Sequence, residues 1–131
     1  MSVAVIYEHT DEGEVALQAA AGTVDPSENL QILTTWSGSS AAGAHQAEHD
    51  AVHASVSAAL PNNTSWHLDL VDPTEDPTGA LITRIAELAP RLLVLGTRHR
   101  SALGKMILGR PQQRLLLEVD QPVLVVKPGR N

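Results

Sequence analysis

Residues 95–114 read LGTRHRSALGKMILGRPQQR and carry more information than any other part of this chain. They follow an apolar run that ends at Leu95, and they precede a short helical pattern and a second apolar run, Pro122–Val126. Three glycines and five lysine or arginine residues therefore separate a buried strand from the start of a helix. An α/β protein binds anions at such a place, because backbone N–H groups and a helix N-terminus both point at the ligand.

The charge distribution also singles out this segment. Arg98, Arg100, Lys105, Arg110 and Arg114 are five of the nine Lys and Arg residues in a chain of net charge −6. Positive charge gathered in one loop of an acidic protein favours a negatively charged ligand there. The alternative is that these side chains are solvated and the loop only connects two elements. An acidic chain with one basic loop is not expected to bind nucleic acid, which needs an extended basic surface.

Length and composition limit the class of protein. A chain of 131 residues suffices for one domain, so we expect a single domain over residues 1–131. The absence of cysteine excludes disulfides and thiolate metal sites. No run approaches the roughly 18 to 20 apolar residues of a membrane span, and no secretion signal precedes the first apolar run. We therefore expect a cytoplasmic protein that does not bind membranes.

Apolar runs alternate with helical patterns along the chain. Strands are expected over residues 2–7, 30–35, 66–71, 91–95 and 122–126, and helices over 11–22, 44–60, 77–88 and 111–119. Asp11 with Glu14 fits a capping box, and Asp76 before Pro77 marks the start of the third helix. The alternation predicts a right-handed βαβ series and a parallel sheet. Its ligand crevice is expected beyond the carboxyl ends of the strands, where the strand order reverses.

Several of these features together resemble the universal stress protein family. The resemblance lies mainly in Gly96-Thr97, Gly109, the helix that follows, and Pro122-Val-Leu-Val-Val-Lys127, while Asp76–Leu81 and Arg98–Lys105 are similar to an actinobacterial-type branch. It implies a three-layer α/β fold with an open, parallel, five-stranded sheet in the order 3-2-1-4-5, Rossmann-like and of the adenine-nucleotide α-hydrolase type. It also implies a stress-response protein that forms a homodimer through its last strand, here Val123–Val126.

The ATP motif of that family, Gly-x2-Gly-x9-Gly-Ser/Thr, is only partly present. Gly96 and Gly109 match it, but His99 replaces the second glycine and Arg110 replaces the Ser/Thr. His99 adds a Cβ to the phosphate loop, and Pro111 removes an N–H donor from the helix start. Against these losses, Arg110 and Arg98 or Arg100 offer forked guanidinium groups, which bind phosphate through charge-assisted hydrogen bonds of comparable strength, so the two effects leave nucleotide binding open.

The resemblance places three groups of residues around an adenine nucleotide. Tyr7 or Glu8 would face the ribose, Thr34–Trp36 the base, and the Gly96–Arg110 loop the phosphates. The expected ligand-binding residues are Tyr7, Glu8, Thr35, Trp36, Gly96, Thr97, Arg98, His99, Arg100, Gly109 and Arg110. ATP, another adenine nucleotide or a related anion is the expected ligand, and Mg²⁺ could accompany a nucleotide. The alternative is a nucleotide-free member of the same fold that acts as a dimeric protein-interaction module, and Trp36 is then a rim or core residue.

No catalytic constellation is evident. Gly-x-Ser-x-Gly does not occur, and no general base is apparent, so any ATP hydrolysis would be slow and incidental. His45, His49 and His53 recur every four residues, a spacing that allows neighbouring imidazoles to share a metal. No carboxylate clearly completes such a site, so histidines without a ligand are the preferred interpretation. A metal-dependent hydrolase and a pH-sensitive patch are the remaining hypotheses for this helix.

Overall fold

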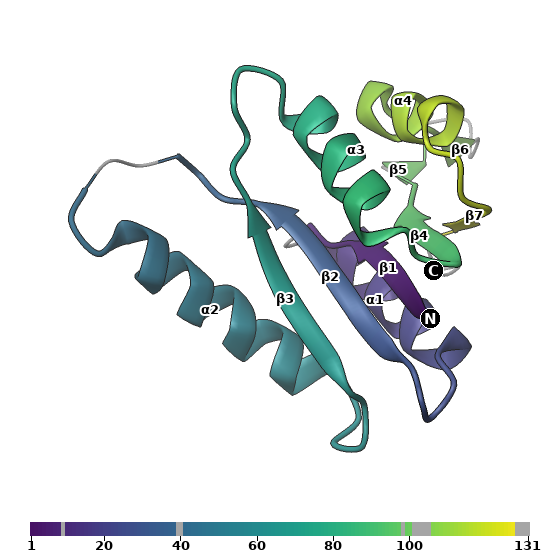
Figure 1. Ribbon diagram of the computed structural model, residues 1–131, viewed down its shortest axis with the longest axis horizontal. Coiled ribbons are helices and arrows are strands. Elements are labelled where there is room, and N and C mark those ends of the chain that lie inside the picture. The colour runs from purple at the N-terminus through teal and green to yellow at the C-terminus, as the bar shows by residue number, and fades with distance from the viewer. Residues whose placement is uncertain (9, 39–40, 98, 101–105, 128–131) are drawn as a thin grey trace.

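The computed structural model describes residues 1–8, 10–38, 41–97, 99–100 and 106–127, with no side-chain description for residues 11, 12, 99, 100, 106 and 107. Strands and helices alternate along these residues (Figure 1). The elements are β1 Ser2–Ile6, α1 Asp11–Thr23, β2 Asn29–Thr35, α2 Ala44–Ala59, β3 Trp66–Val71, α3 Pro77–Leu88, β4 Leu92–Gly96, β5 His99–Arg100, β6 Met106–Ile107, α4 Arg110–Glu118 and β7 Val123–Val126.

The main sheet has five strands in the order β3-β2-β1-β4-β7. All four neighbouring pairs are parallel, for example Val5 beside Ile32 and Val5 beside Val94. Since β7 is the fifth strand of this sheet, the predicted order 3-2-1-4-5 is confirmed. The order reverses between β1 and β4, which places the expected crevice at the carboxyl ends of these two central strands.

A two-stranded antiparallel ladder, β5 with β6, lies within the segment that was expected to be an anion-binding loop. His99 pairs with Ile107, and Arg100 pairs with Met106. Strands of two residues are too short to show any periodicity, so the sequence pattern could not indicate them.

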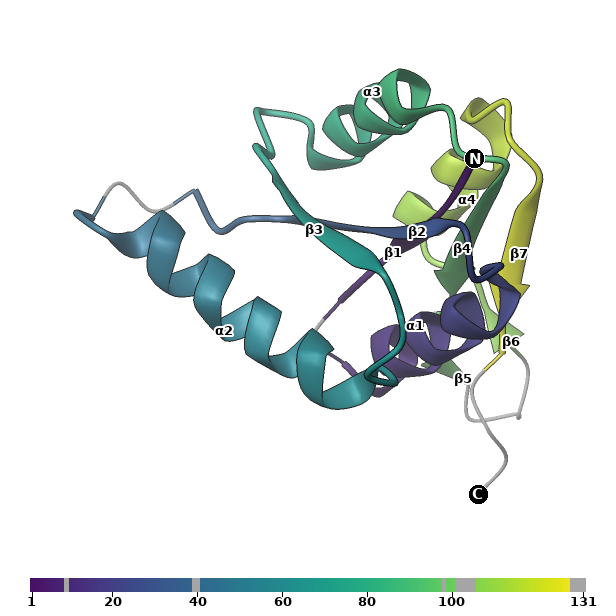
Figure 2. The same cartoon turned by 60° about the horizontal axis from the view of Figure 1, so that its bottom comes forward.

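Two helices cover each face of the sheet, α1 and α2 on one side and α3 and α4 on the other (Figure 2). Side chains of a strand alternate between faces, and β1 follows this rule. Val3 and Val5 join the core beneath α1 and α2, whereas Ala4 and Ile6 belong to the core beneath α3 and α4. Because the central strands are covered on both faces, they read as continuous apolar runs in the sequence.

The helix starts test two predictions. Asp76 caps α3 as expected, since its Oδ1 accepts a hydrogen bond from the Gly79 N–H at 3.1 Å and Pro77 lies in the first turn. The predicted capping box of Asp11 and Glu14 is wrong, because the N-cap lies one residue earlier than Asp11. Thr10 is the N-cap of α1, because its backbone is extended and its Oγ1 accepts from the Gly13 N–H at 3.1 Å. Among the described residues, no helix combines the length and apolar character needed to cross a membrane.

Candidate functional site

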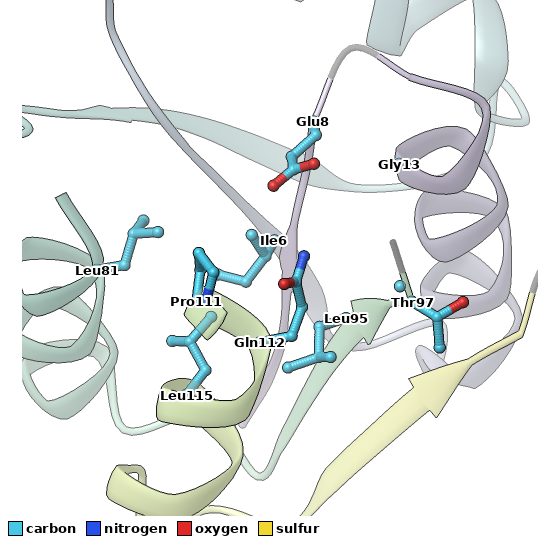
Figure 3. Close-up of a pocket in the computed structure, with 10 residues that line it drawn as sticks. Ile6, Glu8, Gly13, Leu81, Leu95, Thr97, Pro111, Gln112 and Leu115 are labelled. Atoms are coloured by element: carbon cyan, nitrogen blue, oxygen red, sulfur yellow. The ribbon is translucent and has the colours of Figure 1, made fainter. Parts of the chain in front are cut away.

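A cavity opens beyond the carboxyl ends of β1 and β4, at the reversal of the strand order (Figure 3). The end of β1 contributes Ile6 and Glu8 to its wall, and the end of β4 contributes Leu95, Gly96 and Thr97. The helices contribute Gly13 of α1, Leu81 of α3, and Pro111, Gln112 and Leu115 of α4. The structure therefore brings together three of the predicted site residues, namely Glu8, Gly96 and Thr97.

Tyr7 does not line this cavity. Its side chain is 1% exposed and packs with Val3 and Val5 in the core beneath α1 and α2, on the opposite face of the sheet from Ile6. Burial raises the pKa of Tyr7, and the charge of Glu14 raises it further. The sequence prediction left Tyr7 and Glu8 as alternatives for the ribose, and of these two residues Glu8 lines the cavity.

The backbone at Glu8 is held by close contact with α1. A Cβ on Gly13 would overlap the carbonyl oxygen of Glu8, so only glycine permits this approach. The N–H of the same glycine donates to the Thr10 cap. Sequence reasoning missed Gly13 as a residue of the cavity wall, because the need for glycine arises from a tertiary contact that no local pattern records.

Two buried polar residues line the cavity, Thr97 at 5% exposure and Gln112 at 8%. Within the described part of the chain, the Thr97 Oγ1 and the Gln112 Oε1 have no hydrogen-bond partner. Buried polar groups of native proteins are almost always paired. An unpaired polar group on a residue of a cavity wall therefore indicates a place for a hydrogen-bonding ligand or water. Gln112 was not foreseen, although its position three residues after Gly109 in the first turn of a helix is visible in the sequence.

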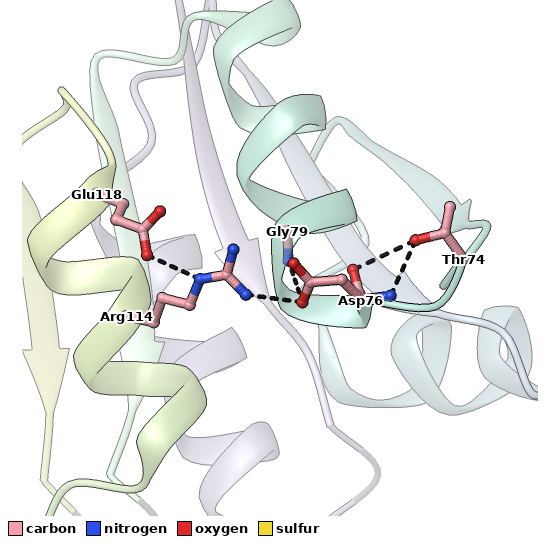
Figure 4. Close-up of polar contacts among 5 residues, drawn as sticks. All are labelled: Thr74, Asp76, Gly79, Arg114 and Glu118. Carbon is pink, nitrogen blue, oxygen red and sulfur yellow. Dashed lines mark hydrogen bonds and ion pairs between the residues drawn. The ribbon is translucent and has the colours of Figure 1, made fainter.

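Arg114 is not part of a cationic loop around this cavity. Its Nη1 lies 2.7 Å from the Asp76 Oδ1, and its Nε lies 2.7 Å from the Glu118 Oε2 (Figure 4). The hydrogen bond from Arg114 holds the pKa of the Asp76 carboxyl below its ordinary value, and the bond from the Gly79 N–H adds to this effect. The two carboxylates in turn raise the pKa of Arg114. The expectation that five basic residues surround a ligand is therefore wrong for this one.

The other basic residues of the segment are described only in part. Arg110 is the first residue of α4 and is exposed to solvent, and Gly109 before it is the buried N-cap. Arg98 and Lys105 lie outside the described residues, and so do the side chains of His99 and Arg100. Their roles in phosphate binding stay predictions.

Thr35 and Trp36 lie at the end of β2 and do not belong to the cavity wall. The Trp36 N–H donates to the Val71 carbonyl at 3.2 Å, and its ring packs edge-on against His45 with centroids 5.0 Å apart. This packing on α2 fits the interpretation of Trp36 as a rim residue.

The histidines of α2 also pack on aromatic rings. The His53 ring lies 4.6 Å from the Trp66 ring and 5.9 Å from the His49 ring, measured between centroids. In the part of the chain that the structure describes, no three His, Asp or Glu side chains are arranged to hold a metal ion. The geometry gives no support to a metal-dependent hydrolase at this helix.

The model of the universal stress protein family matches residues 2–127. The chain belongs to this family. A universal stress protein from Mycolicibacterium smegmatis is 51% identical over 53 residues, which cover 40% of this chain and 41% of that relative. The match thus spans less than half of the relative's length, and it agrees with the actinobacterial-type resemblance seen in the sequence.

Solved structures of universal stress proteins share the fold. A protein from Archaeoglobus fulgidus has a TM-score of 0.78 at 20% identity, with 97% of this chain and 98% of that chain covered. A structure of an Archaeoglobus fulgidus universal stress protein in complex with dAMP has a TM-score of 0.75 at 16% identity and the same coverage. A universal stress protein in complex with cAMP has a TM-score of 0.69 at 22% identity, with 98% of both chains covered. These likenesses confirm the Rossmann-like fold.

Proposed function

We propose that this universal stress protein binds an adenine nucleotide in the cavity at the ends of β1 and β4, and acts in a stress response as a binding protein. The observation that carries the proposal is a cavity at the reversal of the strand order, lined by Thr97 and Gln112, each with a buried polar atom that has no partner among the described residues. Complexes of structurally similar family members with dAMP and cAMP support this choice of ligand class. The expected place of action is the cytoplasm, which cell fractionation tests.

The residues of the cavity suit the parts of a nucleotide. The carboxylate of Glu8 accepts hydrogen bonds, as sugar hydroxyls require, and Gly96 allows close backbone approach. Phosphates would lie near the start of α4, where unpaired N–H groups and the helix dipole favour negative charge. Arg110 stands exposed at this start and offers a charge-assisted contact, whereas Pro111 has no N–H to offer. Mg²⁺ is expected only as a companion of bound phosphates.

Isothermal titration calorimetry with AMP and ATP, with and without Mg²⁺, tests the proposal directly. We expect saturable binding that is weakened in a Glu8→Ala variant, because the carboxylate lines the cavity. Glu75→Ala is the matched control, since Glu75 is exposed and lies outside the cavity wall. The absence of binding by the wild-type protein at millimolar AMP and ATP would overturn the proposal.

The second candidate function is a homodimeric interaction module. It is favoured by β7, the last strand of the sheet, where Leu124 is 39% exposed. The preceding helix α4 adds two exposed leucines, Leu116 at 41% and Leu117 at 81%. An apolar strand at the edge of a sheet tends to pair with another chain, and a two-fold pairing of identical edges closes the assembly. Sedimentation velocity tests this proposal, and a wild-type protein that stays monomeric at high concentration would refute it.

A further inference from the structure

We propose that Gln112 and Glu8 together bind a sugar hydroxyl of the nucleotide, so that the site distinguishes ribose from deoxyribose. The inference rests on the proposed function and adds a residue that determines specificity. It starts from the position of Gln112, the third residue of α4, which is 8% exposed although its side chain carries both hydrogen-bond donors and acceptors.

The surroundings of Gln112 do not satisfy this amide. Its cavity neighbours Ile6, Leu95 and Leu115 are apolar, and its Oε1 has no partner among the described residues. The amide extends towards the side of the cavity on which Glu8 lies (Figure 3). No hydrogen bond joins these two side chains in the described part of the chain, and both residues line the same cavity.

The chemistry of the two side chains selects that group. An ionised carboxylate only accepts hydrogen bonds, whereas an amide both donates and accepts. A hydroxyl meets both demands, because it donates to Glu8 and accepts from or donates to Gln112. A phosphate oxygen meets neither well, because it cannot donate and its charge is repelled by Glu8. The sugar of the nucleotide is therefore the part that fits between them, and the apolar walls suit its carbon skeleton.

This arrangement differs from the family pattern that the sequence resembles. That pattern has a Ser or Thr directly after the last glycine, whereas this chain has Arg110 there. Arg110 is exposed and outside the cavity wall, and the first polar side chain of α4 inside the cavity is Gln112. The hydroxyl contact is consequently a property of this chain's own residues.

Calorimetric titration with AMP, 2′-deoxy-AMP and 3′-deoxy-AMP tests the inference. We expect the wild-type protein to bind AMP roughly tenfold or more tightly than at least one deoxy analogue, the effect of losing one hydrogen bond to a charged group. Gln112→Met keeps the length of the side chain without the amide, and should bring the ratio close to one by weakening AMP more than that analogue. Gln18→Leu, on the exposed side of α1, should leave the ratio unchanged.

Each outcome decides between the two proposals. Binding of AMP with no preference over either analogue, or with a preference that Gln112→Met leaves intact, overturns the inference and leaves the proposed function standing. The absence of binding by all three nucleotides overturns the proposed function and the inference with it. Gln112→Leu serves as a second variant if the methionine variant does not fold, with circular dichroism as the check of folding.

Discussion

Glu28 is a buried carboxylate that forms an ion pair with a single arginine. Its two carboxylate oxygens each lie 2.7 Å from a nitrogen of Arg91, and Arg91 also donates to the Thr23 carbonyl. The hydrogen bonds from Arg91, and then the one from the Asp25 N–H, lower the pKa of Glu28 from its ordinary value of 4.5 to about 2, against the effect of burial. The contact joins the end of α1, the turn before β2 and the residue that precedes β4.

This shift predicts a pH dependence of stability. A carboxyl group whose pKa is lowered by folding stabilises the native state above its ordinary pKa, and this stabilisation is lost as the pH falls through the folded value. The melting temperature of Glu28→Gln should therefore lie several degrees below that of the wild type at pH 7, and the two should converge between pH 4.5 and about 2. Thermal unfolding followed by circular dichroism measures this. Glu75→Gln should run parallel to the wild type throughout, and a constant gap for Glu28→Gln would contradict the argument.

Substitution of Gln112 is expected to raise stability, whereas substitution of Glu28 lowers it. The buried Gln112 Oε1 has no partner among the described residues, and such a group destabilises the ligand-free protein, so Gln112→Met should raise its stability by about 1 kcal/mol, or roughly 2–4 °C in melting temperature. Thermal melts without nucleotide measure the gain. A lower melting temperature would show that the amide has a partner within the protein.

At the scale of the elements, the ends of the five sheet strands and four helices were predictable to within one residue. Apolar runs bounded by glycine, proline and capping residues fix such elements through local rules. Three features escaped these rules. The Thr10 cap depends on which of two adjacent polar residues is extended, the β5–β6 ladder is too short to show a period, and the glycine at position 13 is required only by its contact with Glu8.

Two glycines of α1 should respond oppositely to the same substitution. Gly13→Ala places a methyl group against the backbone of Glu8, an overlap that should destabilise the protein by about 1–3 kcal/mol. Gly22→Ala meets no atom within 4 Å and should stabilise the helix by up to about 1 kcal/mol. Denaturant unfolding of both variants measures the difference. Equal effects of the two would refute the close contact.

At the scale of the whole molecule, the sequence indicated where the site would form but not which side chains would face it. The crevice position follows from the strand order, which βαβ rules and the family resemblance supply. The orientation of Tyr7 into the opposite core, the burial of Gln112 and the pairing of Arg114 with Asp76 depend on tertiary packing. A count of basic residues in the loop therefore overstated its positive charge.

The exposed edge at β7 gives a prediction about assembly. If the proposed dimer forms through this strand, Leu124→Lys should turn it into a monomer, since lysine on an edge strand opposes pairing with another edge. Sedimentation velocity at matched concentrations measures the change. His67→Lys is the control, because His67 is exposed on β3 at the other end of the sheet. A dimer that survives Leu124→Lys but not His67→Lys would place the contact on the β3 edge and contradict the prediction.

The close contact between the Glu8 carbonyl and Gly13 has a consequence for redesign of the ligand site. The main chain at residue 8 is located by a backbone contact, and its side chain is exposed at the mouth of the cavity. The side chain of residue 8 can therefore be replaced without moving the backbone at this position. To adapt the cavity to a different ligand, residue 8 is the first position to substitute, and Gly13 should be kept.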